Sequence, residues 1–226
     1  MKINARFLLP ILGLPITLIL GACTMLQSHS KPMTSETATP VSSETVLAQN
    51  NGMMPGNHSM MMDLGPADAE YDLRFIDGMI PHHQGAIKMA EQVLQKSNNP
   101  ELKKLAEEII KAQKKEIAQM QEWRKTWYPQ AKDAIMYHAA MGHSMSMSKE
   151  QMESMMMMVD LGAADGGFDQ RFIQAMIPHH EGALIMAKDA QSKSKRPEIQ
   201  QLSQAILVSQ AAEIKLMKQW LKPGSN

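Results

Sequence analysis

The sequence predicts an all-α fold, an antiparallel four-helix bundle built from two repeated helical hairpins. Three observations predict it. The stretch MIPHHQGAIKMA at position 79 returns as MIPHHEGALIMA at position 176. Apolar residues in both copies recur at the three- and four-residue spacing of a helix face. A single helical hairpin leaves its apolar side open, whereas two hairpins cover each other.

The repeat extends well beyond this motif. A constant offset of 97 residues pairs His82 with His179, and about 30 of 65 aligned positions are then identical without a gap. The same offset pairs Arg74 with Arg171. Identity on this scale indicates a duplicated structural unit.

Each unit predicts two helices. In the first unit we expect Asp68 to be the N-cap of a helix that runs to about Lys96, and Pro100 to open the second helix. The polar turn between them is short, so the two helices must be antiparallel neighbours. Pro81 lies inside the first helix, as Pro178 does in the second unit, and predicts a kink or local break.

The N-terminus predicts export. In the first 22 residues, basic side chains precede an apolar run, as in a signal peptide. The stretch LGAC at positions 20–23 resembles a lipoprotein cleavage site, at which Cys23, the only cysteine, would carry lipid. The alternative is a soluble secreted protein cleaved near residues 47–49. We expect a periplasmic or envelope location, with membrane contact only through a lipidated Cys23.

Composition divides the rest of the chain. After the signal peptide (residues 1–22) we expect a tether rich in Met, Ser, Thr and Pro over residues 23–60, with little structure. The first helical hairpin takes residues 61–127, a Met- and His-rich linker residues 128–157, and the second hairpin residues 158–226. The net charge is +0, so we expect no nucleic-acid partner.

Polar side chains meet at one level of each predicted hairpin. Counting from the turn places six residues close together, and the second unit repeats the set: Met79, His82, His83, Gln113, Glu116 and Met120. These groups interrupt an aliphatic stripe, and buried polar groups need partners. One hypothesis is a hydrogen-bonded layer that fixes helix register. The other is a metal site.

The methionine content favours the metal site. The chain has 23 methionines but only four phenylalanines, which exceeds the use of Met as an adaptable core residue. Thioether sulfur is a soft ligand that suits Cu(I), and imidazole suits copper in both oxidation states. Thioether needs no deprotonation and forms no disulfide outside the cytoplasm. A protein that holds Cu(I) in an oxidising compartment would use Met and His in place of Cys.

The linker carries the same residue types in the stretch HAAMGHSMSM from position 138. We interpret it as a weak, exchangeable Cu(I) site outside the packed core, and the alternative is a flexible linker with incidental methionines. Ser148 with Gln151 is expected to cap a short helix after it. The candidate metal ligands are therefore Met79, His82, His83, Met89, Glu116, Met120, His138, Met141, His143, Met145, Met147, Met176, His179, His180, Met186, Glu213 and Met217.

The two histidines of one pair have different predicted roles. Adjacent residues on a helix point about 100° apart, so the pair cannot bind one ion side by side. We expect His82 and His179 to be the ligands, with Met79 and Met89 beside His82 on the neighbouring stripe. We expect His83 to face the core of its own hairpin, near Gln113 and Glu116, and His83 and His180 to have an orienting or structural role.

The pattern FDxRFIxxMIPHHxGAxxMA, followed after one turn by PE(L/I)xxLxxxIxxxQxxEIxxMxxW, resembles the bacterial "domain of unknown function three hundred and five" family. It occurs twice, over residues 63–126 and 160–223, with Tyr71 where the pattern has Phe. The resemblance implies an all-helical fold related to ferritin-like bundles. For a two-copy, Met-rich, exported member it implies periplasmic copper binding and copper resistance, with Cu(I) preferred and Cu(II) and Ag(I) as further ions.

We therefore expect a protein that is not an enzyme and that sequesters, buffers or delivers Cu(I) in the bacterial envelope, with a copper exporter or sensor as a partner. The alternative is a metalloenzyme on the same bundle, above all a cuprous oxidase. Di-iron chemistry is not expected, because the chain has no Glu-x-x-His motif. A structural or adaptor module is the third class, and it predicts no response to metal.

Overall fold

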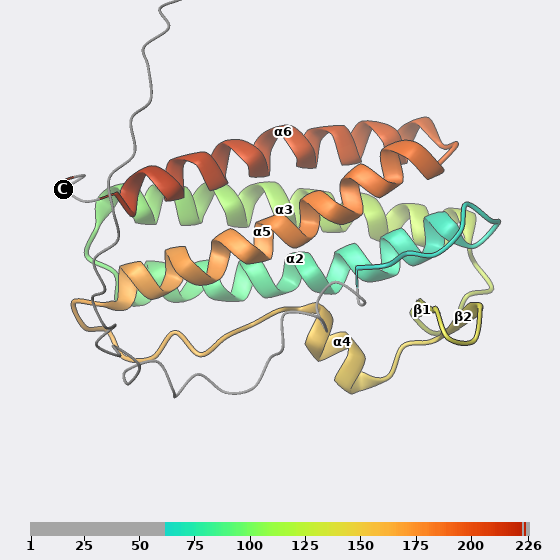
Figure 1. The fold of residues 1–226 in the computed structure, drawn as a ribbon, viewed down its shortest axis with the longest axis horizontal. Coiled ribbons are helices and arrows are strands. Elements are labelled where there is room, and N and C mark those ends of the chain that lie inside the picture. Colours follow the sequence, from blue (N-terminus) through green and yellow to red (C-terminus); the bar gives the residue numbers. More distant parts are fainter. Residues whose placement is uncertain (1–61, 223, 225–226) are drawn as a thin grey trace, which may run out of the picture. The chain divides into compact units, whose positions relative to one another are not determined.

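Two helical hairpins account for most of the computed structural model, which describes residues 62–222 and 224. The first hairpin consists of α2 (Tyr71–Lys96) and α3 (Pro100–Trp127), and the second of α5 (Phe168–Lys193) and α6 (Pro197–Trp220). Figure 1 shows the four helices side by side, with α2 and α5 in contact between the hairpins. The predicted all-α bundle of two repeated hairpins is confirmed. None of the helices in the described residues is long and apolar enough to cross a membrane.

The start of α2 differs from the prediction. Asp68 is not the N-cap, because the helix begins at Tyr71 after Glu70, and no side chain of the described residues caps it. Asp68 accepts a hydrogen bond from the Glu70 N–H (2.9 Å) and forms an ion pair with Arg74 (2.9 Å). The carboxylate is thus used to neutralise a buried arginine. In contrast, α3 begins as predicted, with Pro100 in its first turn.

The prolines inside the two first helices do not break them. Both α2 and α5 continue through Pro81 and Pro178 without interruption, so the predicted local break is wrong. Proline removes one backbone hydrogen bond. Buried residues on both sides of each proline pack against other helices and keep the helix together.

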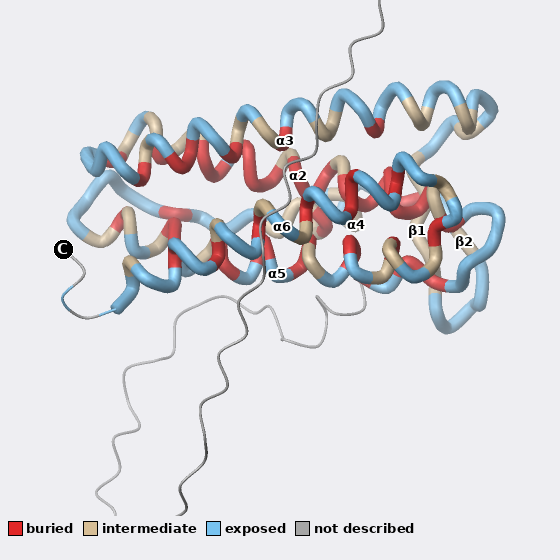
Figure 2. The backbone as a smooth tube through the Cα atoms, turned by 90° about the horizontal axis from the view of Figure 1, so that it is seen from above, coloured by how far each residue is buried: buried red, intermediate tan, exposed pale blue. Residues whose placement is uncertain are grey.

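The core consists of two apolar clusters related by the repeat. One combines the first half of α2 with the second half of α5 and the first half of α6. The other combines the second half of α2 and the first half of α3 with the first half of α5. Figure 2 shows the buried residues on the inward sides of the helices. Both histidine pairs lie between these clusters along the chain, so the bundle has a polar centre between two apolar halves.

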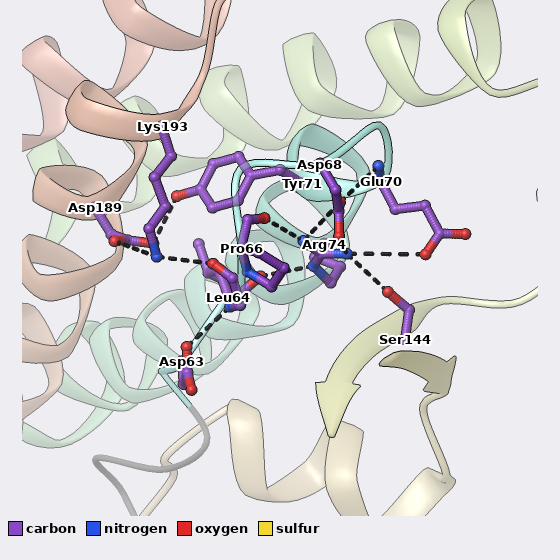
Figure 3. Close-up of polar contacts among 11 residues, drawn as sticks. Asp63, Leu64, Pro66, Asp68, Glu70, Tyr71, Arg74, Ser144, Asp189 and Lys193 are labelled. Carbon is purple, nitrogen blue, oxygen red and sulfur yellow. Dashed lines mark hydrogen bonds and ion pairs between the residues drawn. The ribbon is translucent and has the colours of Figure 1, made fainter. Parts of the chain in front are cut away.

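The loop that leads into each hairpin is held by an arginine. In Figure 3, Arg74 donates from Nε to the Leu64 carbonyl (2.6 Å) and from Nη2 to the Pro66 carbonyl (2.7 Å). Arg171 makes the equivalent bonds in the second repeat. Only the first arginine is fully buried, because it also donates to the Ser144 hydroxyl (2.8 Å), which belongs to the segment between the hairpins.

That segment contains regular structure. Strand β1 (Ile135–His138) pairs antiparallel with β2 (His143–Ser146), and α4 (Lys149–Met155) follows. The predicted cap of the short helix is present, with Ser148 and Gln151 bonded reciprocally. Both β1 and α4 contact α2, and Figure 1 shows them beside it.

Part of the methionine tract belongs to the packed core. Met147 is 7% exposed and Met155 is 1% exposed. Our expectation that the tract lies outside the core is therefore wrong for Met147, and it holds for Met141 and Met145, which are exposed. The cause is the docking of the segment onto α2, which the linker composition does not predict.

A buried ion pair fixes the β-hairpin to the first repeat. Asp77 of α2 accepts from Arg124 Nε (2.6 Å) and from the Ile135 N–H (2.9 Å). The second repeat has Gln174 and Leu221 at the two equivalent positions. Within residues 62–222, this ionic attachment of the hairpin therefore occurs on the first repeat alone.

Asp77→Asn should lower the free energy of unfolding by about 2 kcal/mol, because it removes a charged acceptor from Arg124 and from the Ile135 N–H. Urea unfolding followed by far-UV circular dichroism measures the change. Lys114→Met is the control, because it removes only the exposed ion pair with Glu91 (3.5 Å). It should change stability by less than about 0.5 kcal/mol. Equal effects of the two substitutions would contradict the docking role.

Candidate metal centre

Four histidines are buried at the centre of the bundle, two on α2 and two on α5. The rings of His82 and His179 pack against each other, with 4.0 Å between their centroids and 49° between their planes. These two residues are equivalent in the repeat. Their contact therefore places them at the pseudo-two-fold axis that relates the two hairpins.

The second histidine of each pair faces its own hairpin. His83 Nε2 lies 2.7 Å from Glu116 Oε2, and His180 Nε2 lies 2.6 Å from Glu213 Oε2. The predicted direction of His83 is thus confirmed. Both carboxylates are partly exposed, and Glu116 lines a groove of about 320 Å³ between α3 and α6. Because Nε2–H donates to the carboxylate, Nδ1 carries the lone pair in the neutral ring.

Every buried histidine of the centre has a ring nitrogen without a hydrogen-bond partner among the described residues. His82 has none at either nitrogen, and Nδ1 is free in His83, His179 and His180. His179 Nε2 lies 3.1 Å from the carbonyl oxygen of Met156. Buried polar atoms without partners are rare in proteins. Free imidazole nitrogens at a buried centre therefore indicate a place for a ligand that accepts electron pairs, such as a metal ion.

A methionine segment, Met155–Met157, covers this centre. A Cβ atom at Gly85 would collide with the carbonyl oxygen of Met156, so the segment can approach α2 only because residue 85 is glycine. Met157 has a φ of +47°, in the left-handed region that side chains other than glycine seldom adopt. The segment is thus held tightly against the histidines in a strained conformation.

A second glycine brings a thioether next to an imidazole. A Cβ atom at Gly182 would lie 3.1 Å from His82 Nε2, 3.3 Å from Met157 Sδ and 3.4 Å from Met62 Cε. Gly182 is the repeat equivalent of Gly85. Its missing side chain leaves space in which His82 and Met157 face the same point.

The electrostatics of the centre favour neutral histidines. Burial lowers the pKa of His82 well below its usual range, and the nearby His179, His83 and His180 lower it further. Burial, followed by the nearby His180, lowers the pKa of His179 to about 3. Both rings are therefore neutral near pH 7, and protons do not compete with a metal ion for their lone pairs.

The six helical methionines among the predicted ligands are divided between the two core clusters. Met79, Met120 and Met186 belong to one cluster, and their repeat counterparts belong to the other, namely Met176, Met217 and Met89. All six are fully buried. Met79 and Met89, which we predicted beside His82, thus pack into opposite halves of the core.

The predicted ligands of the segment between the hairpins lie elsewhere. His138, Met141, His143 and Met145 belong to the β-hairpin at the start of α2, and the structure does not bring them to the histidine centre. Within residues 62–222, no three His, Cys, Asp or Glu side chains converge to hold one ion. A metal at the bundle centre would therefore need thioether ligands beside the imidazoles.

Our candidate ligands did not include Met62, Met156 and Met157, although the composition of the tracts that contain them favours weak, exchangeable Cu(I) binding. Both methionine tracts were visible, since each precedes the repeated Asp-Leu-Gly triplet at 63–65 and 160–162. That triplet fixes where each tract enters the bundle, because the glycine N–H donates to the aspartate carboxylate in both repeats. The repeat register was therefore the signal that could have placed the tracts beside the histidines.

Comparison with known proteins identifies the family. Residues 72–221 match the family described as Domain of unknown function (DUF305). The chain belongs to the DUF305 family. A curated relative, the uncharacterized protein L153 of Acanthamoeba polyphaga mimivirus, is 41% identical over 49 residues, which are 22% of this chain and 32% of that protein. The chain thus matches about a third of that relative's length.

Solved DUF305 structures share the fold. CopM in its Cu(II)-bound form is 44% identical, with a TM-score of 0.53 over 66% of this chain and 94% of CopM. CopM in its Cu(I)-bound form is 40% identical, with a TM-score of 0.50 over the same shares. A DUF305 protein from Streptomyces coelicolor is 25% identical, with a TM-score of 0.50 over 65% of this chain and 88% of that one.

Acid should destabilise the metal-free protein. Histidines in the unfolded chain take up protons below about pH 6.5, whereas His82 and His179 stay neutral in the folded protein until much lower pH. The unfolded state then binds more protons, so the free energy of unfolding falls by about 1.4 kcal/mol per pH unit for each histidine. The loss runs from about pH 6.5 towards pH 3.

Urea titrations at about pH 7, 6 and 5 measure this slope above the range in which carboxylates titrate. His82→Gln/His179→Gln should flatten it. His138→Gln/His143→Gln is the control, because neither ring belongs to the buried centre, and it should leave the slope as in the wild type. An equal slope in all three proteins would contradict the assignment of neutral buried histidines.

Proposed function

We propose that this DUF305 protein binds copper at the bundle centre, with His82, His179 and Met157 as the ligands. One observation carries the proposal: two repeat-related, buried and neutral imidazoles meet at the axis, and a thioether faces the same glycine as one of them. CopM, with the same fold and 44% identity, has structures in Cu(I)-bound, Cu(II)-bound and Ag-bound forms. This similarity supports the same choice of ion here.

The donor set favours Cu(I) over Cu(II). Thioether and imidazole are ligands that Cu(I) accepts well, and Ag(I) shares its softness. The ligands are neutral, so the centre holds a single positive charge at lower desolvation cost than a double one. Glu116 and Glu213 supply negative charge from the outer side through His83 and His180. Cu(II) is therefore the second ion, and Zn(II), which gains little from thioether, should bind more weakly.

His83 and His180 support the centre in this proposal. A carboxylate that accepts the N–H of a histidine fixes its tautomer and its ring orientation, as at many metal sites. Here it directs the lone pair of Nδ1 away from the carboxylate, toward the interior. His83 and His180 thus hold the four-histidine layer in place and leave His82 and His179 free to bind the ion.

We propose that copper exchange requires movement of the methionine segment. The segment lies over the centre, and its Met156 carbonyl is bonded to His179. The strained φ of Met157 lowers the cost of leaving the closed conformation. Such a centre suits a protein that sequesters, buffers or delivers copper and releases it slowly, in contrast to a cuprous oxidase, whose copper must be open to oxygen.

The proposed setting is the bacterial envelope, where the protein contributes to copper resistance and exchanges copper with an exporter or a sensor. The support is the export signal of residues 1–22, the single Cys23 as a lipid attachment site and the use of Met and His in place of further cysteines. The signal, Cys23 and the tether all lie outside the described residues.

His82→Gln/His179→Gln should weaken Cu(I) binding by at least about 100-fold, because both axis ligands are lost. His83→Gln/His180→Gln should lower the unfolding midpoint and weaken binding by about 10-fold, because the orienting bonds to Glu116 and Glu213 are lost. Competitive Cu(I) titration and urea unfolding measure the two effects. Oxygen uptake by the Cu(I)-loaded protein distinguishes binding from cuprous oxidase activity. Stronger copper loss in the second variant would overturn the ligand assignment.

Two glycine substitutions test the role of the methionine segment. Gly182→Ala puts a methyl group between His82 and Met157 and should weaken Cu(I) binding with the segment still in place. Gly85→Ala displaces the Met156 backbone and should speed the release of Cu(I) to a chelator. Stopped-flow chelator competition measures both constants. Unchanged affinity in Gly182→Ala, or unchanged release in Gly85→Ala, would argue against a thioether-closed centre.

A further inference from the structure

The β-hairpin between the two repeats sorts its residues onto two faces. The strand pairing sets Met136 opposite Met145 and His138 opposite His143. Tyr137 and Ser144 form the pair between these two, and successive residues of a strand point to opposite faces. Two methionines and two histidines therefore share one face, and Tyr137 and Ser144 share the other.

The Tyr137 and Ser144 face is the one that docks on the bundle. Arg74 donates to the Ser144 hydroxyl (2.8 Å), as Figure 3 shows, and its guanidinium lies 5.5 Å from the centre of the Tyr137 ring. Gly65 leaves room for the same ring, because a Cβ atom there would collide with it. The face with Met136 and His138 is therefore directed away from Arg74.

The outward face has the features of a soft metal site. His143 Nδ1 lies 3.1 Å from the Met141 carbonyl oxygen, and an N–H donated to that oxygen leaves the lone pair on Nε2. Across the strand, His138 Nδ1 is buried and has no partner among the described residues. Met145 is 39% exposed. Directly opposite side chains in an antiparallel pair are about 5 Å apart at Cβ, so long methionine side chains can close around an ion held by the two imidazoles.

We propose that Met136, His138, His143 and Met145 form a second Cu(I) site, separate from the bundle centre and exposed to solvent at His143 and Met145. The inference rests on the proposed function only in taking Cu(I) as the bound ion. Two imidazoles and two thioethers form a neutral, soft donor set that suits Cu(I) and Ag(I). Because the hairpin is anchored through Asp77 and Arg124, which the second repeat lacks, residues 62–222 contain one such hairpin site.

The exposed position gives this site a different role from that of the bundle centre. No methionine segment has to move before an ion reaches Met145, whose side chain is already open to solvent. The site therefore exchanges Cu(I) quickly and accepts it first from a dissolved chelate. The buried centre, which is closed by Met156 and Met157, takes up and releases its ion more slowly.

The test is a competitive Cu(I) titration of the exported protein with a colorimetric chelator. His138→Gln/His143→Gln should lose one equivalent, the one that exchanges fastest, and Met136→Leu/Met145→Leu should lose it with core volume preserved. Met158→Leu is the matched control, because Met158 is as exposed as Met145, at 39%, and lies outside the hairpin. It should keep the full stoichiometry. In the wild type, Ag(I) should shift the imidazole proton resonances of His138 and His143.

The outcomes separate this site from the bundle centre. His82→Gln/His179→Gln should lose the slow equivalent and keep the fast one. If His138→Gln/His143→Gln keeps the wild-type stoichiometry and exchange rates, the hairpin inference is overturned and the bundle centre is unaffected. If the wild type binds no Cu(I), the proposed function fails and the hairpin site fails with it. Loss of copper in Met158→Leu equal to that in Met136→Leu/Met145→Leu would show a nonspecific methionine effect and reject the site.

Discussion

The contact between His82 and His179 is the constraint on which the rest of the molecule depends. Because the two residues are repeat equivalents, their packing at 4.0 Å sets how the two hairpins meet. It also buries polar rings, which costs roughly 1–3 kcal/mol for each atom left without a partner. The apolar clusters on both sides offset this cost through burial of methionines, aromatic rings and aliphatic side chains. A soft cation would satisfy the nitrogens that the protein leaves free.

The duplication also permits the two halves to differ. The Met156 carbonyl bonds His179 and lies against Gly85, while Met157 lies against Gly182 beside His82, so one segment contacts both repeats differently. Asp77 and Arg124 anchor the β-hairpin to the first repeat. The equivalent residues of the second repeat, Gln174 and Leu221, cannot form an ion pair. Tyr71 departs from the Phe of the second repeat, and its hydroxyl donates to Asp189 (2.8 Å). A symmetric scaffold thus supports asymmetric contacts to one connecting segment.

The sequence predicts what depends on local spacing. Helix periodicity and a short turn before Pro100 give both hairpins, and counting from that turn gives the His83 contact with Glu116. Local spacing does not predict that His82 contacts His179, because the pattern within one hairpin contains no information on how the other hairpin is rotated against it. Nor does it predict the β-hairpin, whose strands carry mixed polar and thioether residues and are held by contacts with Arg74 and Asp77 that are distant in sequence. Asp68 was misassigned because its carboxylate binds Arg74 and the Glu70 N–H before the helix begins at Tyr71.

The two proposed copper sites share imidazole and thioether donors but differ in what surrounds them. At the bundle centre, burial keeps His179 neutral, with its pKa lowered to about 3, and a strained segment covers the rings. On the hairpin, strand pairing alone brings the donors together, and Met145 stays open to solvent. Equal ligands in a desolvated, preorganised place hold an ion longer than in an exposed one. With copper at both proposed sites, the difference in burial would favour transfer from the hairpin toward the axis histidines.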